Sequence, residues 1–242
     1  MGSGIYIYGV IEAKELKEFG PIGVGEKPVY TIGIGTLAFV VSEADREEYI
    51  ADSVNLGEHE RVLEVVMKMM TILPMRFGTV AANEKEIMLM LKKHHHVFAR
   101  ALKKLYGKVE VEIEVLWTDM KTVFDEIVEA NPKLKRLKLS DGPKQRNDVI
   151  MAGQMVYKLL EEKKKKEING IVKQLKRRAL EFAQSQSTED EMIMKGSFLI
   201  DKARIEEFDR ALDGIDAKMG GRVKIKYFGP MPPYSFINMR LR

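Results

Sequence analysis

The sequence contains no cysteine among its 242 residues and only one tryptophan. The missing cysteine excludes disulfide scaffolds, thiolate metal sites and cysteine nucleophiles, and it suits a reducing compartment such as the cytoplasm. No apolar run approaches the roughly 18 residues of a membrane-spanning helix, and the opening MGSGIYIYGV lacks the basic start of a secretory leader. We therefore expect a globular cytoplasmic protein that does not enter a membrane.

Signatures of common enzyme chemistry are also missing. The glycine-rich stretch at 20–25 lacks the lysine and serine that end a Walker-type phosphate loop, and no GxSxG nucleophile motif occurs. Three consecutive histidines, His94, His95 and His96, point in different directions on a helix and so cannot hold one metal ion together. We expect no enzyme activity, no cofactor and no metal site.

Residues 1–107 predict a first α+β domain. Apolar patterning indicates strands at 5–10, 29–33 and 36–42, then a helix over 58–71. A strand-like run at 72–80 is interrupted by Pro74, and a further helix follows over 83–107. This βββαβα order is long enough to build its own core.

Residues 108–229 predict a second domain of the ferredoxin-like type. The strand at 108–117 alternates apolar residues with three glutamates, Glu110, Glu112 and Glu114, which we expect on a solvated face. The last strand, at 222–228, alternates apolar residues with three cations, Arg222, Lys224 and Lys226. In a ferredoxin-like sheet these two strands are antiparallel neighbours, so the two charge rows would pair across them.

Residues 147–184 predict a long helical segment, either one helix or two with a break near residue 167. Its first apolar seam contains Val149 and Leu159, and its second ends at Phe182. Many cations follow the first seam: Lys163, Lys164, Lys165, Lys166, Lys173, Lys176, Arg177 and Arg178. They form either the solvated face of a protruding helix or a docking surface for an acidic or amphipathic partner. Nucleic-acid binding is the alternative function, although no aromatic residues are interleaved with these cations.

The sequence is also rich in methionine, with 15 residues. Six of them cluster in the first domain: Met67, Met69, Met70, Met75, Met88 and Met90. Their spacing predicts that most belong to the core. Flexible thioether side chains at a surface would instead suit adaptable binding of hydrophobic partners.

Residues 230–242 predict a C-terminal tail. A proline-rich connector at 229–233 is expected to be stiff and extended, and residues 234–241 are strand-like. We expect the tail to pack back on the first domain.

Five stretches, in their order and spacing, resemble the gas vesicle protein GvpL/GvpF family. They are GIYIYGV at 4–10, HExVLE at 59–64, ILPMRFGT at 72–79, KVEVEI at 108–113 and GPMPPYSF at 229–236. The residues that carry the resemblance most specifically are Pro74, Arg76, Phe77, Gly78, Pro230, Pro233, Tyr234 and Phe236. Met231 stands where the family often has tryptophan, and the motifs do not separate the F type from the L type.

The resemblance implies an accessory or minor structural protein of gas vesicle assembly, not an enzyme. It implies binding of the small, aggregation-prone main shell protein, which would be kept competent during nucleation. The implied partners are the main gas vesicle shell protein and other gas vesicle accessory proteins, with no nucleic acid and no membrane, and the implied location is the cytoplasm and the gas vesicle. The implied fold is two ferredoxin-like or modified ferredoxin-like α+β domains with a long helical segment and a C-terminal tail. The motif residues are expected mainly to fix turns and their packing, with partner binding as the alternative.

Overall fold

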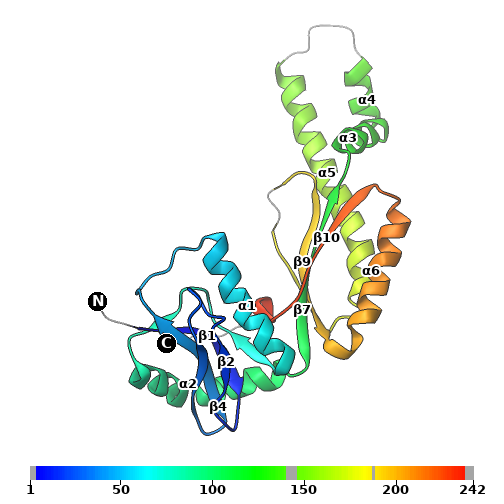
Figure 1. The fold of residues 1–242 in the computed structure, drawn as a ribbon. Helices are drawn as coiled ribbons and strands as arrows, with labels where there is room; N and C mark the ends of the chain where they lie inside the picture. Colours follow the sequence, from blue (N-terminus) through cyan, green and yellow to red (C-terminus); the bar gives the residue numbers. More distant parts are fainter. Residues whose placement is uncertain (1–3, 140–145, 187–188, 238–242) are drawn as a thin grey trace. The chain divides into compact units, whose positions relative to one another are not determined.

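The computed structural model describes residues 4–139, 146–186 and 189–237 (Figure 1). The chain forms two compact units, one from the described parts of 1–110 and 230–242 and the other from those of 111–229. Each unit combines helices with one antiparallel sheet, as the α+β prediction requires. Division into separate domains 1–107, 108–229 and 230–242 stays a prediction. No helix in the described ranges is long and apolar enough to cross a membrane.

The sheet of the first unit has the strand order β2-β3-β4-β1-β5, and β6 also pairs with β1. Its strands are β1 (Gly4–Glu12), β2 (Glu18–Gly20), β3 (Val29–Ile34), β4 (Leu37–Ala44), β5 (Ile72–Pro74) and β6 (Val80–Ala81). Helix α1 (Ser53–Met69) packs its Val62, Leu63 and Val66 on one face of the sheet. Helix α2 (Glu84–Leu105) packs on the other face, where Phe98 meets Phe39 of β4.

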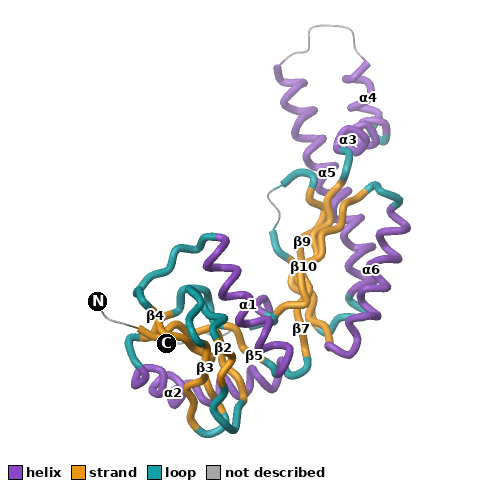
Figure 2. Tube along the Cα trace, in the orientation of Figure 1, coloured by secondary structure: helices purple, strands orange, loops and turns teal. Residues whose placement is uncertain are grey.

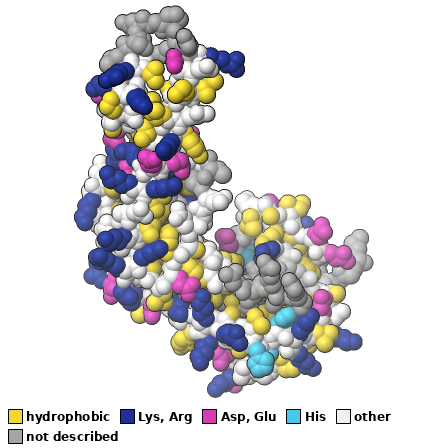
Figure 3. Space-filling model, turned by 180° about the vertical axis from the view of Figure 1, so that it is seen from behind, with side chains coloured by type: hydrophobic (Ala, Val, Ile, Leu, Met, Phe, Trp, Pro, Cys, Tyr) yellow, Lys and Arg dark blue, Asp and Glu magenta, His cyan; other side chains and the backbone are white. Residues whose placement is uncertain are grey.

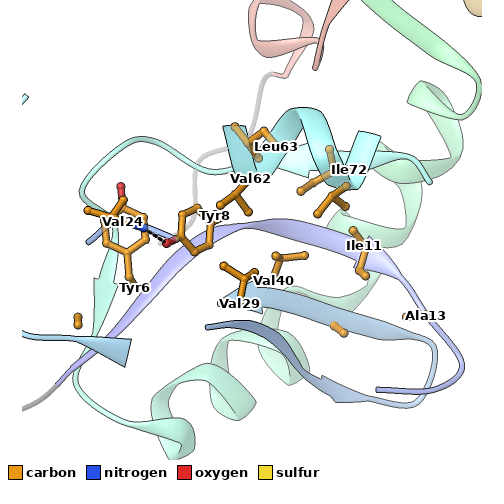
Figure 4. Close-up of a cluster of buried hydrophobic side chains, with 13 residues drawn as sticks. Tyr6, Tyr8, Ile11, Ala13, Val24, Val29, Val40, Val62, Leu63 and Ile72 are labelled. Atoms are coloured by element: carbon orange, nitrogen blue, oxygen red, sulfur yellow. Dashed lines mark hydrogen bonds between the residues drawn. The ribbon is translucent and has the colours of Figure 1, made fainter. Parts of the chain in front are cut away.

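Strand β1 is the centre of this unit. It is buried on both faces from Tyr6 to Ile11, as its apolar pattern predicts. A register shift between Ile7 and Gly9 interrupts the alternation of side chains. Tyr6, Tyr8 and Ile11 therefore all join the hydrophobic cluster beneath α1 (Figure 4).

The second unit has the βαββαβ order of a ferredoxin-like fold, with the strand order β10-β7-β9-β8. Its strands are β7 (Lys108–Trp117), β8 (Glu181–Gln184), β9 (Met192–Asp201) and β10 (Val223–Met231). Its helices are α3 (Met120–Glu129), α4 (Pro132–Leu139), α5 (Arg146–Leu175) and α6 (Ile205–Met219), which a short 3-10 turn, η1 (Lys202–Arg204), precedes. Helices α5 and α6 pack beside each other against this sheet (Figure 2). Strands β7 and β10 are neighbours in this sheet, which confirms the prediction.

The long helix differs from its prediction at the C-terminal end. Helix α5 is continuous through residue 167 and ends at Leu175, not near residue 184. Phe182 belongs to β8, where its ring lies 4.7 Å from the ring of Phe198 on β9. Phe182 has helical spacing, but pairing of its segment with β9 overrides this local periodicity. The first bond of this pairing runs from Leu180 N–H to the Leu199 carbonyl (2.7 Å).

Two further predictions are wrong. The glutamates of β7 are not on a solvated face, because Glu110 is 2% exposed and Glu114 is 7% exposed. The tail is not a strand within the described residues. Its connector continues β10 as far as Met231, and a 3-10 helix, η2 (Tyr234–Phe236), follows. The rest of the predicted strand, 238–241, lies outside the described residues.

Candidate functional site

The stretches that carry the family resemblance meet around Tyr6 in the first unit. Its ring lies 4.8 Å from that of Tyr8, 5.0 Å from that of Tyr49 and 6.3 Å from that of Phe77. The ring of His59, on α1, lies 5.8 Å from that of Phe77 and 5.4 Å from that of Tyr8. We call Tyr6, Tyr8, Tyr49, His59 and Phe77 the aromatic cluster. It joins β1, α1 and the segment after β5.

Hydrogen bonds fix the polar atoms of the aromatic cluster. The Tyr6 hydroxyl accepts from Gly78 N–H at 2.9 Å and lies 3.0 Å from His59 Nδ1. The Tyr8 hydroxyl accepts from Val24 N–H at 2.8 Å, the dashed line of Figure 4, and lies 2.9 Å from Ser42 Oγ. The two hydroxyls and His59 Nδ1 are thus hydrogen-bonded inside the protein, as in a packed structural core, whereas His59 Nε2 is buried without a hydrogen-bond partner among the described residues.

Burial sets the protonation of this cluster. It raises the pKa of both Tyr6 and Tyr8, so both hydroxyls stay protonated near neutral pH. Burial also lowers the pKa of His59 to about 4. His59 is therefore neutral at pH 7, and its Nδ1 can accept a hydrogen bond from the Tyr6 hydroxyl.

The motif segment after β5 is a tight turn held against β1. Thr79 N–H donates to the Arg76 carbonyl at 3.2 Å, and Gly78 has a φ of +76°, as the third residue of a type II turn requires. Two backbone bonds of 2.8 Å, from Ile7 N–H to Thr79 and from Met75 N–H to Tyr8, dock the segment on β1. Pro74 is buried and Phe77 is half-buried, whereas the Arg76 side chain is exposed. Of these four motif residues, Arg76 has the side chain most open to a partner.

The motif of the tail lies beside the same cluster. Ser235 donates from its backbone N–H (2.8 Å) and its hydroxyl (2.6 Å) to the buried carboxylate of Glu110. Desolvation raises the pKa of Tyr234, and Glu60, Tyr6 and Glu110 nearby raise it further. Pro233 is buried, Phe236 is half-buried and Pro230 is exposed. The structure thus brings Tyr234 close to Tyr6, a proximity that no local pattern in the sequence indicates.

The clustered methionines are not core residues. None of Met67, Met69, Met70, Met75, Met88 and Met90 is fully buried, so the prediction that most lie in the core is wrong. Valine and leucine take the core face of α1, and Met67 and Met70 pack against the same core while only partly buried. Met69 is 57% exposed and Tyr106, at the end of α2, is 77% exposed. Gly107 N–H donates to Thr71 Oγ1 at 3.4 Å and so brings these two helix ends together.

The basic segment at 163–178 divides into two groups. Lys163 forms an ion pair with Glu126 at 2.9 Å, and Lys164, only 8% exposed, donates to the Glu189 carbonyl at 3.2 Å. The Lys176 ammonium lies 4.6 Å from the ring centre of Phe182, and Arg178 donates to the Gln174 carbonyl at 3.1 Å. The remaining four cations are exposed: Lys165, Lys166, Lys173 and Arg177. Half of the predicted surface therefore has a structural role.

The charge rows of β7 and β10 pair only in part. Lys226 lies 3.2 Å from Glu114, as predicted, but Arg222 pairs with Glu126 of α3. Lys195 of β9, which the sequence did not single out, lies 2.7 Å from Glu114 and 3.2 Å from Glu112. Lys195 first, then Lys226, lowers the pKa of Glu114, so its carboxylate stays charged in a nearly buried position.

A second charged network anchors the middle of α5. Arg222 and then Lys163 lower the pKa of Glu126 to about 2. Glu167 accepts from the Trp117 indole N–H at 2.9 Å and lies 3.5 Å from Arg222. These residues tie α3, α5 and β7 together and belong to the scaffold of the second unit.

The consecutive histidines form no metal site in the described part of the chain, where no group of three histidine or acidic side chains is arranged to hold an ion. His94 is half-buried, with its ring 6.0 Å from that of Phe98. The described geometry therefore offers a packed aromatic cluster, an exposed apolar margin and separate cationic surfaces.

Known proteins match this chain over almost its whole length. Residues 4–238 match the family described as gas vesicle synthesis protein GvpL/GvpF. Gas vesicle protein F of Microcystis aeruginosa (strain PCC 7806) is 31% identical over 244 residues, which cover 99% of this chain and 100% of that protein.

Two crystal structures of gas vesicle protein GvpF share the fold. The one from Anabaena sp. PCC7120 has a TM-score of 0.84 and 28% identity, and the match covers 98% of this chain and 97% of that one. The one from Microcystis aeruginosa has a TM-score of 0.83 and 29% identity, with 98% and 99% covered. The predicted fold class is confirmed.

Proposed function

Because this chain belongs to the gas vesicle protein GvpL/GvpF family, we propose that it binds the main gas vesicle shell protein and limits its aggregation during nucleation. The family supports a role in gas vesicle assembly, and the relatives are named as gas vesicle proteins. The proposed role is non-catalytic and is exercised in the cytoplasm and at the growing gas vesicle.

The observation that carries this proposal is the exposed apolar margin at the ends of α1 and α2. We call Met67, Met69, Met70 and Tyr106 the methionine margin, in which Met69 and Tyr106 are exposed and Met67 and Met70 are half-buried against the core. Large apolar side chains exposed together mark interaction surfaces, and methionine adapts to partners of different shape. Here Met69 and Tyr106 are both more than half exposed, and the hydrogen bond from Gly107 to Thr71 holds their helix ends side by side.

The motif residues support this surface indirectly. The aromatic cluster fixes α1 on β1 through Tyr6 and His59, and the turn at 76–79 continues from the same edge. We propose a scaffold role for Pro74, Phe77, Gly78, Pro233 and Phe236. For Arg76, Tyr234 and Pro230, which are exposed to different degrees, partner contact is proposed as well.

The experiment is co-expression of the chain with the main shell protein, followed by measurement of soluble shell protein and by pull-down at low and high salt. An apolar contact survives high salt, whereas a contact through cations is weakened by it. Met69→Lys with Tyr106→Lys should abolish the pull-down. Leu16→Lys is the matched control, because Leu16 is an exposed apolar residue (73%) in a loop after β1. Equal precipitation of the shell protein with and without the chain would defeat the proposal.

The exposed cations Lys165, Lys166, Lys173 and Arg177 are proposed to bind other gas vesicle accessory proteins of acidic character. Nucleic acid remains the competing ligand for this surface. Its affinity would fall steeply with salt in proportion to the phosphates contacted. Binding of a single-stranded RNA at physiological salt, lost when the four cations are replaced by glutamine, would favour nucleic acid instead.

A further inference from the structure

A second surface, in the other unit, is a groove between α4 and α5. Its volume is about 820 Å³, and it is lined by Pro132, Lys133 and Arg136 from α4 and by Met151, Met155 and Leu159 from α5. All of these residues belong to the unit formed by 111–229 and lie within its described part. The groove shares no lining residue with the methionine margin or with the exposed cations at 165–177.

The floor of the groove on α5 is a continuous apolar stripe. Met151, Met155 and Leu159 follow one another at intervals of four residues and so lie on one face of the helix, over about 12 Å at 1.5 Å per residue. Met151 is 62% exposed, and Met155 and Leu159 are half-buried. Figure 3 shows hydrophobic side chains exposed among lysines and arginines on the helical part of this unit. The described chain therefore covers this stripe only in part. Of the apolar seam predicted from Val149 to Leu159, only Leu159 lines the groove.

The rim of the groove is positively charged. Lys133 and Arg136 lie on the α4 side and Lys158 on the α5 side, and within the described residues neither Lys133 nor Arg136 forms an ion pair. Among the described residues, the one acidic lining residue is Glu162, whose carboxylate lies 4.0 Å from the Lys158 ammonium. Charge complementarity therefore calls for acidic groups beside the apolar face of whatever fills the groove.

The shape of the groove selects the form of its occupant. Both walls are helices, whose backbone N–H groups are committed to helical bonds, so no strand edge is offered for an added strand. An apolar floor two turns long between charged rims matches the apolar face of a helix. We propose that this groove binds an amphipathic helix of another protein, with acidic residues on both sides of its apolar stripe.

The test uses the full chain and two designed peptides of about 18 residues, which is five helical turns. One peptide carries leucines at helical spacing flanked by glutamates, and the other has lysines in place of the glutamates. Methionine methyl NMR reports the place of binding, and fluorescence anisotropy reports the affinity. With the acidic peptide, the methyl signals of Met151 and Met155 should shift and saturate together. The basic peptide should bind roughly tenfold more weakly or not at all.

Charge reversal on the rim gives the second arm of the test. Lys133→Glu with Arg136→Glu should weaken the acidic peptide roughly tenfold and bring the basic peptide into the groove. Lys202→Glu with Lys218→Glu is the control, because it makes the same change in charge at exposed positions of the same unit. Thermal melts confirm that all variants fold alike.

Several outcomes would overturn the proposal. One is a shift that spreads to the methionines of the first unit. Others are equal binding of the two peptides, and equal weakening by the control variant. If the chain self-associates and the rim variants abolish this self-association, the groove binds a second copy of the chain. Adsorption to anionic lipid vesicles in place of peptide binding would assign it to a lipid surface. The readouts do not involve the shell protein, so this test and that of the proposed function fail independently.

Discussion

The carboxylate of Glu110 holds both the backbone N–H and the hydroxyl of Ser235, at 2.8 and 2.6 Å, although 125 positions separate the two residues. Glu110 is 2% exposed and is the third residue of β7, the strand that follows α2. A carboxylate so deeply buried needs such partners, because desolvation without them costs several kcal/mol. This pair fastens the motif of the tail to the first unit, next to the aromatic cluster.

Loss of the hydrogen bonds between Ser235 and Glu110 should destabilise the first unit. We expect Ser235→Ala to lower the free energy of unfolding by about 1–3 kcal/mol, because it leaves the buried carboxylate short of one donor. Cleavage of the tail by a protease should become faster in the same variant. Denaturant unfolding and timed proteolysis measure the two effects. Glu12→Gln, a change of one exposed carboxylate in β1, is the control and should leave both unchanged.

The sequence predicts the individual elements of this site but not the tertiary contacts between them. Strand β1, helix α1 and the turn at 76–79 each have a local pattern, so their positions in the chain could be predicted. The hydrogen bonds from Gly78 to Tyr6 and from Ser235 to Glu110 join residues 72 and 125 positions apart, and only the sheet order and the register bring them together. Tyr6 is recognisable as a motif residue, but its partners are not.

The charge rows of β7 and β10 also show that a local pattern does not predict which residues meet in the fold. Alternation in β7 and β10 correctly indicated that the two strands are neighbours. It did not indicate Lys195, because the strand on the other side of β7 depends on the path of the chain through the sheet. It also placed the glutamates in solvent, since a period of two shows only that the faces differ and not what covers each face.

Gly78 should tolerate no side chain without a loss of stability. The cause is its φ of +76° and not a steric clash, because no atom lies within 4 Å of the place where a Cβ would be. We expect Gly78→Ala to lower the free energy of unfolding by about 1–2 kcal/mol, the cost of a left-handed conformation. Gly57→Ala is the matched control. Gly57 lies in α1 with equally open space, so alanine there should stabilise by up to about 1 kcal/mol. Equal effects of the two substitutions in denaturant unfolding would refute this explanation.

His59 should make stability depend on pH in a defined window. Burial lowers its pKa from 6.5 to about 4 in the folded chain, so between these values the unfolded chain binds a proton that the folded chain does not. Stability from this residue is therefore complete above pH 6.5 and is lost as the pH falls toward 4, by about 3 kcal/mol in total. Urea unfolding at several pH values measures the slope. His59→Gln should flatten it in this window, whereas His96→Gln, at an exposed position, should not.

Arg222 should anchor the second unit through Glu126. Its guanidinium makes two bonds to that carboxylate, at 2.5 and 2.8 Å, and lies 3.5 Å from Glu167. Because the network is partly exposed, we expect Arg222→Gln to cost only about 1 kcal/mol, and less at high salt, where such pairs are screened. The folded pKa of Glu126 is about 2, below its ordinary 4.5, so its share of this stability is present above pH 4.5 and fades as the pH falls toward 2. Thermal melts at low and high salt measure the difference. Lys224→Gln, a change at an exposed cation of β10, is the control, and an equal loss there would show that general charge and not this network is responsible.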